Sequence, residues 1–279
     1  MRNIFPPLVV FLFMAGGASV GFAQDGMSGI PEYVTRVRAQ YSIELLYKDI
    51  PQPQGTTALY QEVHPRNYSK LLAFLKILEE ELGRYPSRFF EFSQLQQIYL
   101  VEKCFHHDRP MEGLYNDRDR VILLEIARGS NPIRQRHNIH HELFHMMERS
   151  VQRMVRLDEE EWSKLNKDHF VYGQPSRYKE SESFSSPPRE GFATVYSLTS
   201  PQEDRAEIYA CLMVRSQNRL LSKWMGSDPI LKQKVEYIKR FIVAYCPEMD
   251  ERYWDRLFKG TGNVPGEDGS REKENFSGR

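Results

Sequence analysis

Apolar side chains recur every three to four residues in several stretches of the chain, which is the spacing of an amphipathic helix. Between Tyr68 and Leu82 the leucines share one face, and Gly83 and Pro86 follow as helix breakers. A second helix is predicted from about Ile133 to Met154. Four more helices are predicted toward the C-terminus, over residues 158–168, 200–218, 229–245 and 249–258.

Residues typical of β-strands concentrate between the first two helices. Phe89–Phe92, Gln97–Phe105 and Arg120–Ile126 are rich in aromatic and β-branched side chains, and turn-forming residues fill His107–Asp119. This pattern predicts a small mixed sheet of three or more strands. The order of helix, sheet and further helices predicts an α+β fold, with the sheet followed by a helix that carries the active site and by a helical C-terminal subdomain.

The two ends of the chain differ in composition from its middle. Residues 1–23 contain one basic residue, an apolar run from Ile4 to Met14 and a small residue at position 23, which is typical of a secretory signal peptide cleaved before Gln24. We therefore expect a secreted or periplasmic protein. The run is too short to span a bilayer, and no other stretch is long enough, so no membrane span is expected in the mature chain.

The mature chain is expected to form one domain over residues 24–259, with a sheet-containing part over 24–132 and a helical part over 133–259. The Gly-rich, charged residues 260–279 are expected to form a disordered tail. The sequence predicts no oligomeric state.

Charge and cysteine content narrow the possible functions. The chain has 38 basic and 38 acidic side chains and no basic stripe, which argues against nucleic acid as a partner. Its three cysteines allow at most one disulfide bond, and in an oxidising compartment Cys211 and Cys246 are the better candidate pair. Three separate buried thiols are an equally weighted alternative.

The string His141-Glu142-Leu143-Phe144-His145 lies within the helix predicted from Ile133. Residues four apart share one face of a helix, so both imidazoles can reach one metal ion. Zinc lowers the pKa of a bound water to about 7, and Glu142 beside the first histidine can accept its proton as a general base. The two neighbouring histidines, His137 and His140, are expected to be solvated or to support the ligands.

A third zinc ligand must come from elsewhere in the chain. Glu203, Asp204 and Glu207 are candidates, because residues 203 and 207 lie one helical turn apart. Acidic residues at this place also suit a helix N-terminus, with Ser200 as the N-cap and Pro201 as the first helical residue. From these residues alone the choice among the three stays open.

The spacing Tyr196-x6-Glu203-x2-Ala206-Glu207, followed by Leu212-Met213, resembles the second motif of the anthrax lethal factor-like metallopeptidases, which include the pro-pro endopeptidases. The resemblance covers about residues 133–149 and 191–245 and implies a zincin-like fold. It implies that His141, His145 and Glu203 bind zinc and that Glu142 is the base. It also implies that Tyr196 stabilises the oxyanion and that Glu207 orients a ligand.

The function expected from these features is zinc-dependent hydrolysis of a peptide bond in a peptide or protein substrate. Two alternatives are a zincin-like module that binds peptides or surfaces without turnover, and a zinc amidase that acts on cell-wall peptides. The substrate is expected to pair with the strand at 120–126. The Ser- and Pro-rich loop at 173–188 could close over the site as a lid.

Overall fold

The computed structural model describes residues 29–127, 131–152, 159–173 and 186–259. The expected signal peptide, the expected tail and most of the expected lid loop lie outside these residues. Among the helices that are described, none combines the length and the apolar character needed to cross a bilayer.

A six-stranded mixed sheet forms the N-terminal half together with helices α1 (Ile30–Tyr41), α2 (Tyr68–Leu82) and α3 (Ser87–Ser93). The strands are β1 (Glu44–Leu46), β2 (Ala58–Glu62), β3 (Gln97–His106), β4 (Arg109–Met111), β5 (Gly113–Asn116) and β6 (Val121–Glu125). The long strand β3 pairs in parallel with β1 and β6, and antiparallel with β2 and β4. The prediction of a small mixed sheet is therefore confirmed.

Two predictions about this sheet are wrong. Residues 89–92 belong to helix α3, in which Phe89, Phe90 and Ser93 are buried with helical spacing. The strand at 120–126 is internal, because β6 lies between β3 and β5. The edge on that side is β5, which turns back onto β6 through Asn116, whose Oδ1 accepts from the backbone N–H groups of Arg118 and Asp119.

Helices make up the described part of the C-terminal half. They are α4 (Pro132–Gln152), α5 (Glu159–Lys164), α6 (Pro201–Met213), α7 (Arg215–Met225), α8 (Pro229–Tyr245) and α9 (Glu251–Arg256), with the 3₁₀ helix η3 (Tyr196–Leu198) before α6. The single helix predicted over 200–218 is wrong. Val214 is extended, with ψ at 120°, and ends α6 before α7 begins.

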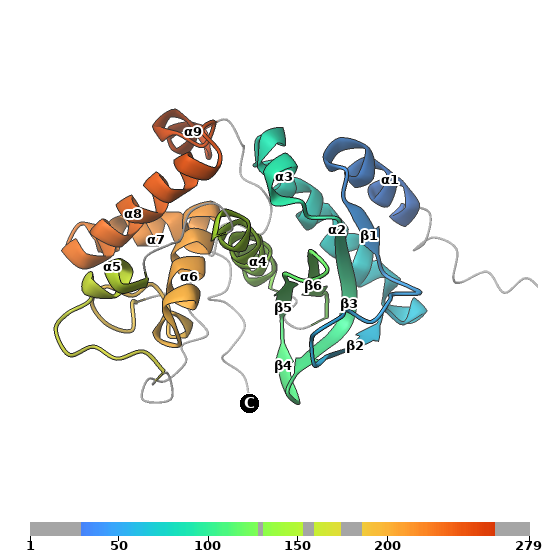
Figure 1. The fold of residues 1–279 in the computed structure, drawn as a ribbon. Helices are drawn as coiled ribbons and strands as arrows, with labels where there is room; N and C mark the ends of the chain where they lie inside the picture. The colour runs from blue at the N-terminus through green and yellow to red at the C-terminus, as the bar shows by residue number, and fades with distance from the viewer. Residues whose placement is uncertain (1–28, 128–130, 153–158, 174–185, 260–279) are drawn as a thin grey trace, which may run out of the picture.

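Helix α4 lies in the middle of the molecule, between the sheet on one side and α6 on the other (Figure 1). Its apolar residues, such as Leu143 and Phe144, belong to a core that also takes in α2, α6 and α8. A buried helix in this position can present polar side chains to both halves of the fold.

All three cysteines are free and buried, so of the two alternatives the structure has three separate thiols and no Cys211–Cys246 bridge. Cys211 lies inside α6, whereas Cys246 follows α8 and directs its thiol to Glu248, with Sγ 3.3 Å from Oε2. Burial raises the pKa of the Cys104 thiol to about 12. Cys104 and Cys211 therefore act as small apolar groups of the core.

Candidate metal centre

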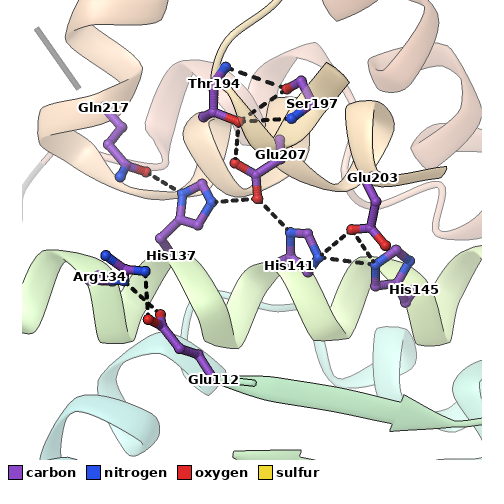
Figure 2. A network of polar contacts seen from close by, with 10 residues as sticks. All are labelled: Glu112, Arg134, His137, His141, His145, Thr194, Ser197, Glu203, Glu207 and Gln217. Atoms are coloured by element: carbon purple, nitrogen blue, oxygen red, sulfur yellow. Dashed lines mark hydrogen bonds and ion pairs between the residues drawn. The ribbon is translucent and has the colours of Figure 1, made fainter. Parts of the chain in front are cut away.

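Helix α4 carries His137, His141 and His145, each one turn after the last, on the face turned toward α6 (Figure 2). The spacing of four residues places the three imidazoles in one row. His137 and His141 are buried and His145 is partly exposed. The row thus runs from the interior of the molecule to its surface.

Helix α6 supplies the facing carboxylates. It begins after Ser200, whose Oγ accepts a hydrogen bond from the backbone N–H of Glu203 at 3.2 Å, and Pro201 is its first residue. This cap fixes the first turn of α6. Glu203 and Glu207, one turn apart, both point down at α4 (Figure 2).

Three potential ligand atoms converge between the two helices. His141 Nε2 lies 3.0 Å from Glu203 Oε2 and 3.0 Å from His145 Nε2, and His145 Nε2 lies 3.3 Å from Glu203 Oε2. Zinc bonds to nitrogen and oxygen are about 2.0–2.1 Å long, so tetrahedral ligands lie about 3.3 Å apart. The spacing and the chemistry of His141, His145 and Glu203 therefore fit a zinc ion.

Glu207 contacts the Nδ1 side of the His141 ring and is not one of the three convergent groups. Its Oε1 accepts from His141 Nδ1 at 2.8 Å, which leaves Nε2 directed at Glu203 and His145. Burial raises the pKa of Glu207, but the charges and hydrogen bonds of His137 and His141 outweigh burial and hold the pKa well below its usual range. Glu207 is therefore an ionised carboxylate that sets the orientation of the His141 ring.

Asp204 faces away from the histidines. Its buried Oδ2 accepts from Lys234 Nζ at 2.6 Å, from Tyr172 at 2.8 Å and from Trp162 Nε1 at 3.1 Å. Lys234 also donates to the carbonyl of Gly191 at 2.8 Å. Of the three acidic candidates, Asp204 thus fixes α6 to α8 and to the segment that leads to η3.

Glu142 follows His141 and is buried on the side of α4 that faces β5. Burial raises the pKa of its carboxyl, while the positive charges of His141 and His145 and a hydrogen bond from the backbone N–H of Tyr115 lower it, and the net pKa is raised. A raised pKa brings a carboxylate closer to the range in which it can exchange protons near neutral pH.

Tyr196 begins η3 and leaves 39% of its surface exposed. Its ring centroid lies 5.8 Å from that of His141. Burial of the hydroxyl raises the pKa of Tyr196, and the carboxylates of Glu203, Glu142 and Glu207 raise it further. The phenol therefore keeps its proton and can donate a hydrogen bond near the histidine row.

The other two histidines of α4, both expected to be solvated or to support the ligands, lie in different surroundings. His137 contacts Glu207 and Gln217, with Nε2 3.1 Å from Glu207 Oε1 and Nδ1 2.8 Å from Gln217 Oε1. The expectation for His140 is wrong, because it is fully buried on the other side of α4 and bonded to Glu81 and Tyr85 of the N-terminal half. The spacing of four residues from His141 was the one signal that set His137 apart from His140.

Residues 120–245 match the model of a family described as "Putative zinc-binding metallo-peptidase". This span runs from β6 through α8 and is a little under half of the chain. It contains the candidate ligands His141, His145 and Glu203, and also Glu142, Tyr196 and Glu207. No protein in the curated set of known proteins matches the sequence.

The fold is similar to that of a crystal structure from Bacteroides caccae titled as a putative zinc-binding metallo-peptidase. The TM-score is 0.51 at 15% sequence identity, and the match covers 85% of this chain and 95% of the other. At this identity the likeness concerns the fold. The family match over residues 120–245 supports the general class of zinc-binding metallopeptidases, and the structural similarity adds a shared fold.

Proposed function

We propose that this protein is an exported zinc metalloendopeptidase in which His141, His145 and Glu203 hold the ion. The observation that carries the proposal is the convergence of His141 Nε2, His145 Nε2 and Glu203 Oε2 within 3.3 Å of one another. The similarity of the Tyr196-to-Glu207 string to the lethal factor-like group supports the choice of Glu203. Export rests on the signal-like residues 1–23.

The surrounding side chains supply the proton transfers. When bound, zinc would acidify a water molecule and polarise the carbonyl of the scissile bond. Glu142 accepts the proton of the attacking water and returns it to the leaving amine, a task that its raised pKa favours. Tyr196 donates a hydrogen bond to the oxyanion that develops on the carbonyl oxygen.

The substrate is expected at the edge strand β5 rather than at β6. Helix α4 holds β5 in place through Asn138, whose Nδ2 donates to the carbonyl of Glu112 at 2.6 Å, and through the ion pair of Arg134 with Glu112. Because β5 ends the sheet next to Glu142, an extended peptide added at this edge would bring its backbone close to the base.

The variant Glu142→Gln separates an enzyme from a binding module. It removes the base and keeps the size of the side chain, so peptide cleavage should fall at least 100-fold while zinc content stays at the wild-type level. Cleavage of a peptide library, followed by mass spectrometry, measures the first quantity, and elemental analysis measures the second. The matched control is Glu160→Gln on α5, an exposed residue paired with Lys164, which should leave both unchanged.

Cleavage that persists in Glu142→Gln would contradict the proposed mechanism. A wild-type protein that holds zinc but cleaves no member of the library, and instead retains peptides unchanged, would favour the binding module.

A further inference from the structure

Glu207 is held by three side chains, two from α4 and one from the segment that precedes η3. Its Oε1 accepts hydrogen bonds from His137 Nε2 at 3.1 Å and from His141 Nδ1 at 2.8 Å, both on α4. Its Oε2 accepts a hydrogen bond from Thr194 Oγ1 at 2.6 Å. Thr194 Oγ1 in turn accepts a hydrogen bond from the backbone N–H of Ser197 at 3.1 Å. Figure 2 shows these contacts as one continuous network that ends at Glu203 and His145.

His137 connects this network to α7. Its Nδ1 lies 2.8 Å from Oε1 of Gln217, and both side chains are buried. Since both nitrogens of the imidazole lie within hydrogen-bond distance of a buried oxygen, its ring cannot rotate without breaking a buried hydrogen bond. His137 therefore presents its Nε2 to Glu207 in one fixed direction.

We propose that His137 is a positioning residue of the metal centre, which fixes Glu207 together with Thr194 and so directs His141 Nε2 at the ion. The inference rests on the proposed function, because it needs His141 to be a ligand. It follows from the general behaviour of metal-binding histidines, whose second ring nitrogen is held by a hydrogen-bonded carboxylate. Here the carboxylate is in turn held by a second histidine, one helical turn before the ligand.

A different role for His137 must be distinguished from this one. His137, His141 and Glu207 also offer three potential ligand atoms within 4.8 Å of one another. An ion at this place would have to displace the hydrogen bond between His141 Nδ1 and Glu207 Oε1, and His141 would have to bridge two ions. His141 Nδ1 lies 2.8 Å from Glu207 Oε1, well below the separation of about 3.3 Å between two ligands of one zinc ion, which favours a proton rather than a second ion between these two atoms.

The test compares His137→Leu with His137→Gln in the chain from residue 24 to residue 279. Leucine removes the bond to Glu207, whereas the glutamine amide can place a donor near the position of Nε2. We expect the dissociation constant for zinc, measured by competition with a chromophoric chelator, to rise about tenfold or more in His137→Leu and to recover in His137→Gln. The absorption bands of the cobalt-substituted protein should shift in the first variant and return in the second.

The matched control is His140→Leu. It removes the adjacent buried histidine, whose hydrogen bonds go to Glu81 and Tyr85, and should lower the melting temperature without changing the affinity for zinc. If His137→Leu does not fold, as judged by circular dichroism, Thr194→Val removes the other bond to Glu207 from a partly exposed position. That variant should weaken zinc binding in the same direction.

Three results would overturn the inference, and they can be told apart. If the wild-type chain binds no zinc, the proposed function fails as well. If the wild type binds one zinc and both His137→Leu and Thr194→Val bind it equally tightly, only the positioning role fails. If the wild type binds two ions and His137→Leu loses one of them, His137 is a ligand instead.

Discussion

Tyr196 differs from its neighbours in the segment before α6. Phe192 and Leu198 are buried, whereas Tyr196 leaves 39% of its surface exposed beside His141. Its side chain therefore contributes little to the apolar core, and its hydroxyl group can meet a ligand at the row of histidines. The exposure of Tyr196 therefore favours a role in contacting a ligand over a role in stabilising the core.

Tyr196→Phe should lower kcat about 100-fold because it removes one donor to the oxyanion and keeps the aromatic ring. KM and zinc content should stay near their wild-type values, since neither the ligands nor β5 is changed. Steady-state kinetics on a peptide substrate measure the effect. Tyr33→Phe, which removes a tyrosine hydroxyl on the distant helix α1, is the control, and an unchanged kcat in Tyr196→Phe would exclude the assigned role.

The pair His141 and His145 could be predicted from sequence because a spacing of four residues has one geometric meaning in a helix. The choice among Glu203, Asp204 and Glu207 could not be made in the same way. Asp204 pairs with Lys234, thirty residues later in the chain. Glu207 is hydrogen-bonded to Thr194 and to His137. The spacing of residues within one helix does not show which side chains from other parts of the chain will contact each carboxylate.

The contact between α4 and β5 determines where Glu142 can lie. A Cβ atom added at Gly113 would come within 2.7 Å of Cγ and Oε1 of Glu142 and within 2.9 Å of Nδ2 of Asn138. Glycine at this position is therefore required for the close approach of the strand to the helix. Strand β5 and the Glu142 side chain are thus in close contact.

Gly113→Ala should displace Glu142 and lower kcat/KM at least tenfold, with little change in zinc content because the three ligands lie on the side of α4 that faces α6. This loss of activity should be larger than any loss of folded protein that a lowered melting temperature implies. Kinetics and thermal unfolding of the same preparation make the comparison. Gly226→Ala, at the C-terminal end of α7, is the control, and equal activity of Gly113→Ala and wild type would show that Glu142 does not need this position.

Several helices could be predicted, the short α5 and α9 among them, whereas the short strands β4 and β5 could not. Helices α2, α4 and α8 agree with the helices expected from apolar spacing. The strands β4 and β5 have three and four residues, and they lie in a stretch that reads as turns because it contains Gly113 and several charged residues. Pairing with β3 and β6, rather than the preference of their own residues, makes them strands.

Helix α4 is fixed to the N-terminal half of the molecule by a second buried polar network. His140 Nε2 lies 2.6 Å from Glu81 Oε2, Tyr85 donates to or accepts from His140 Nδ1 at 2.6 Å, and Glu81 also pairs with Arg84 and Arg136. The helix thus presents His141 to α6 and His140 to α2. This second network lies on the side of α4 away from the candidate metal ligands.

This network predicts how stability depends on pH. Burial raises the pKa of Glu81, but His140, Arg84 and Arg136 outweigh burial and lower the pKa to about 2, from 4.5. A carboxylate with a lowered pKa stabilises the folded state above its unfolded pKa. The contribution of about 3 kcal/mol should therefore be present above about pH 5 and be lost as the pH falls toward 2.

Glu81→Gln should flatten this dependence. The free energy of unfolding, measured by denaturant titration between pH 2 and pH 7 in the presence of a chelator, should differ most from wild type at neutral pH and least near pH 2. Glu160→Gln, at an exposed ion pair, should give a curve parallel to that of wild type. A parallel curve for Glu81→Gln would mean that Glu81 keeps an ordinary pKa in the folded protein.

Elemental analysis by mass spectrometry measures whether this chain holds zinc at His141, His145 and Glu203. The chain from residue 24 to residue 279 is purified without chelators and without added zinc, alongside His145→Ala. We expect about one zinc ion per wild-type chain and a large loss of zinc in the variant, because zinc sites of this class need three protein ligands. Absence of zinc from both proteins, or equal zinc in both, would exclude a zinc site at these residues.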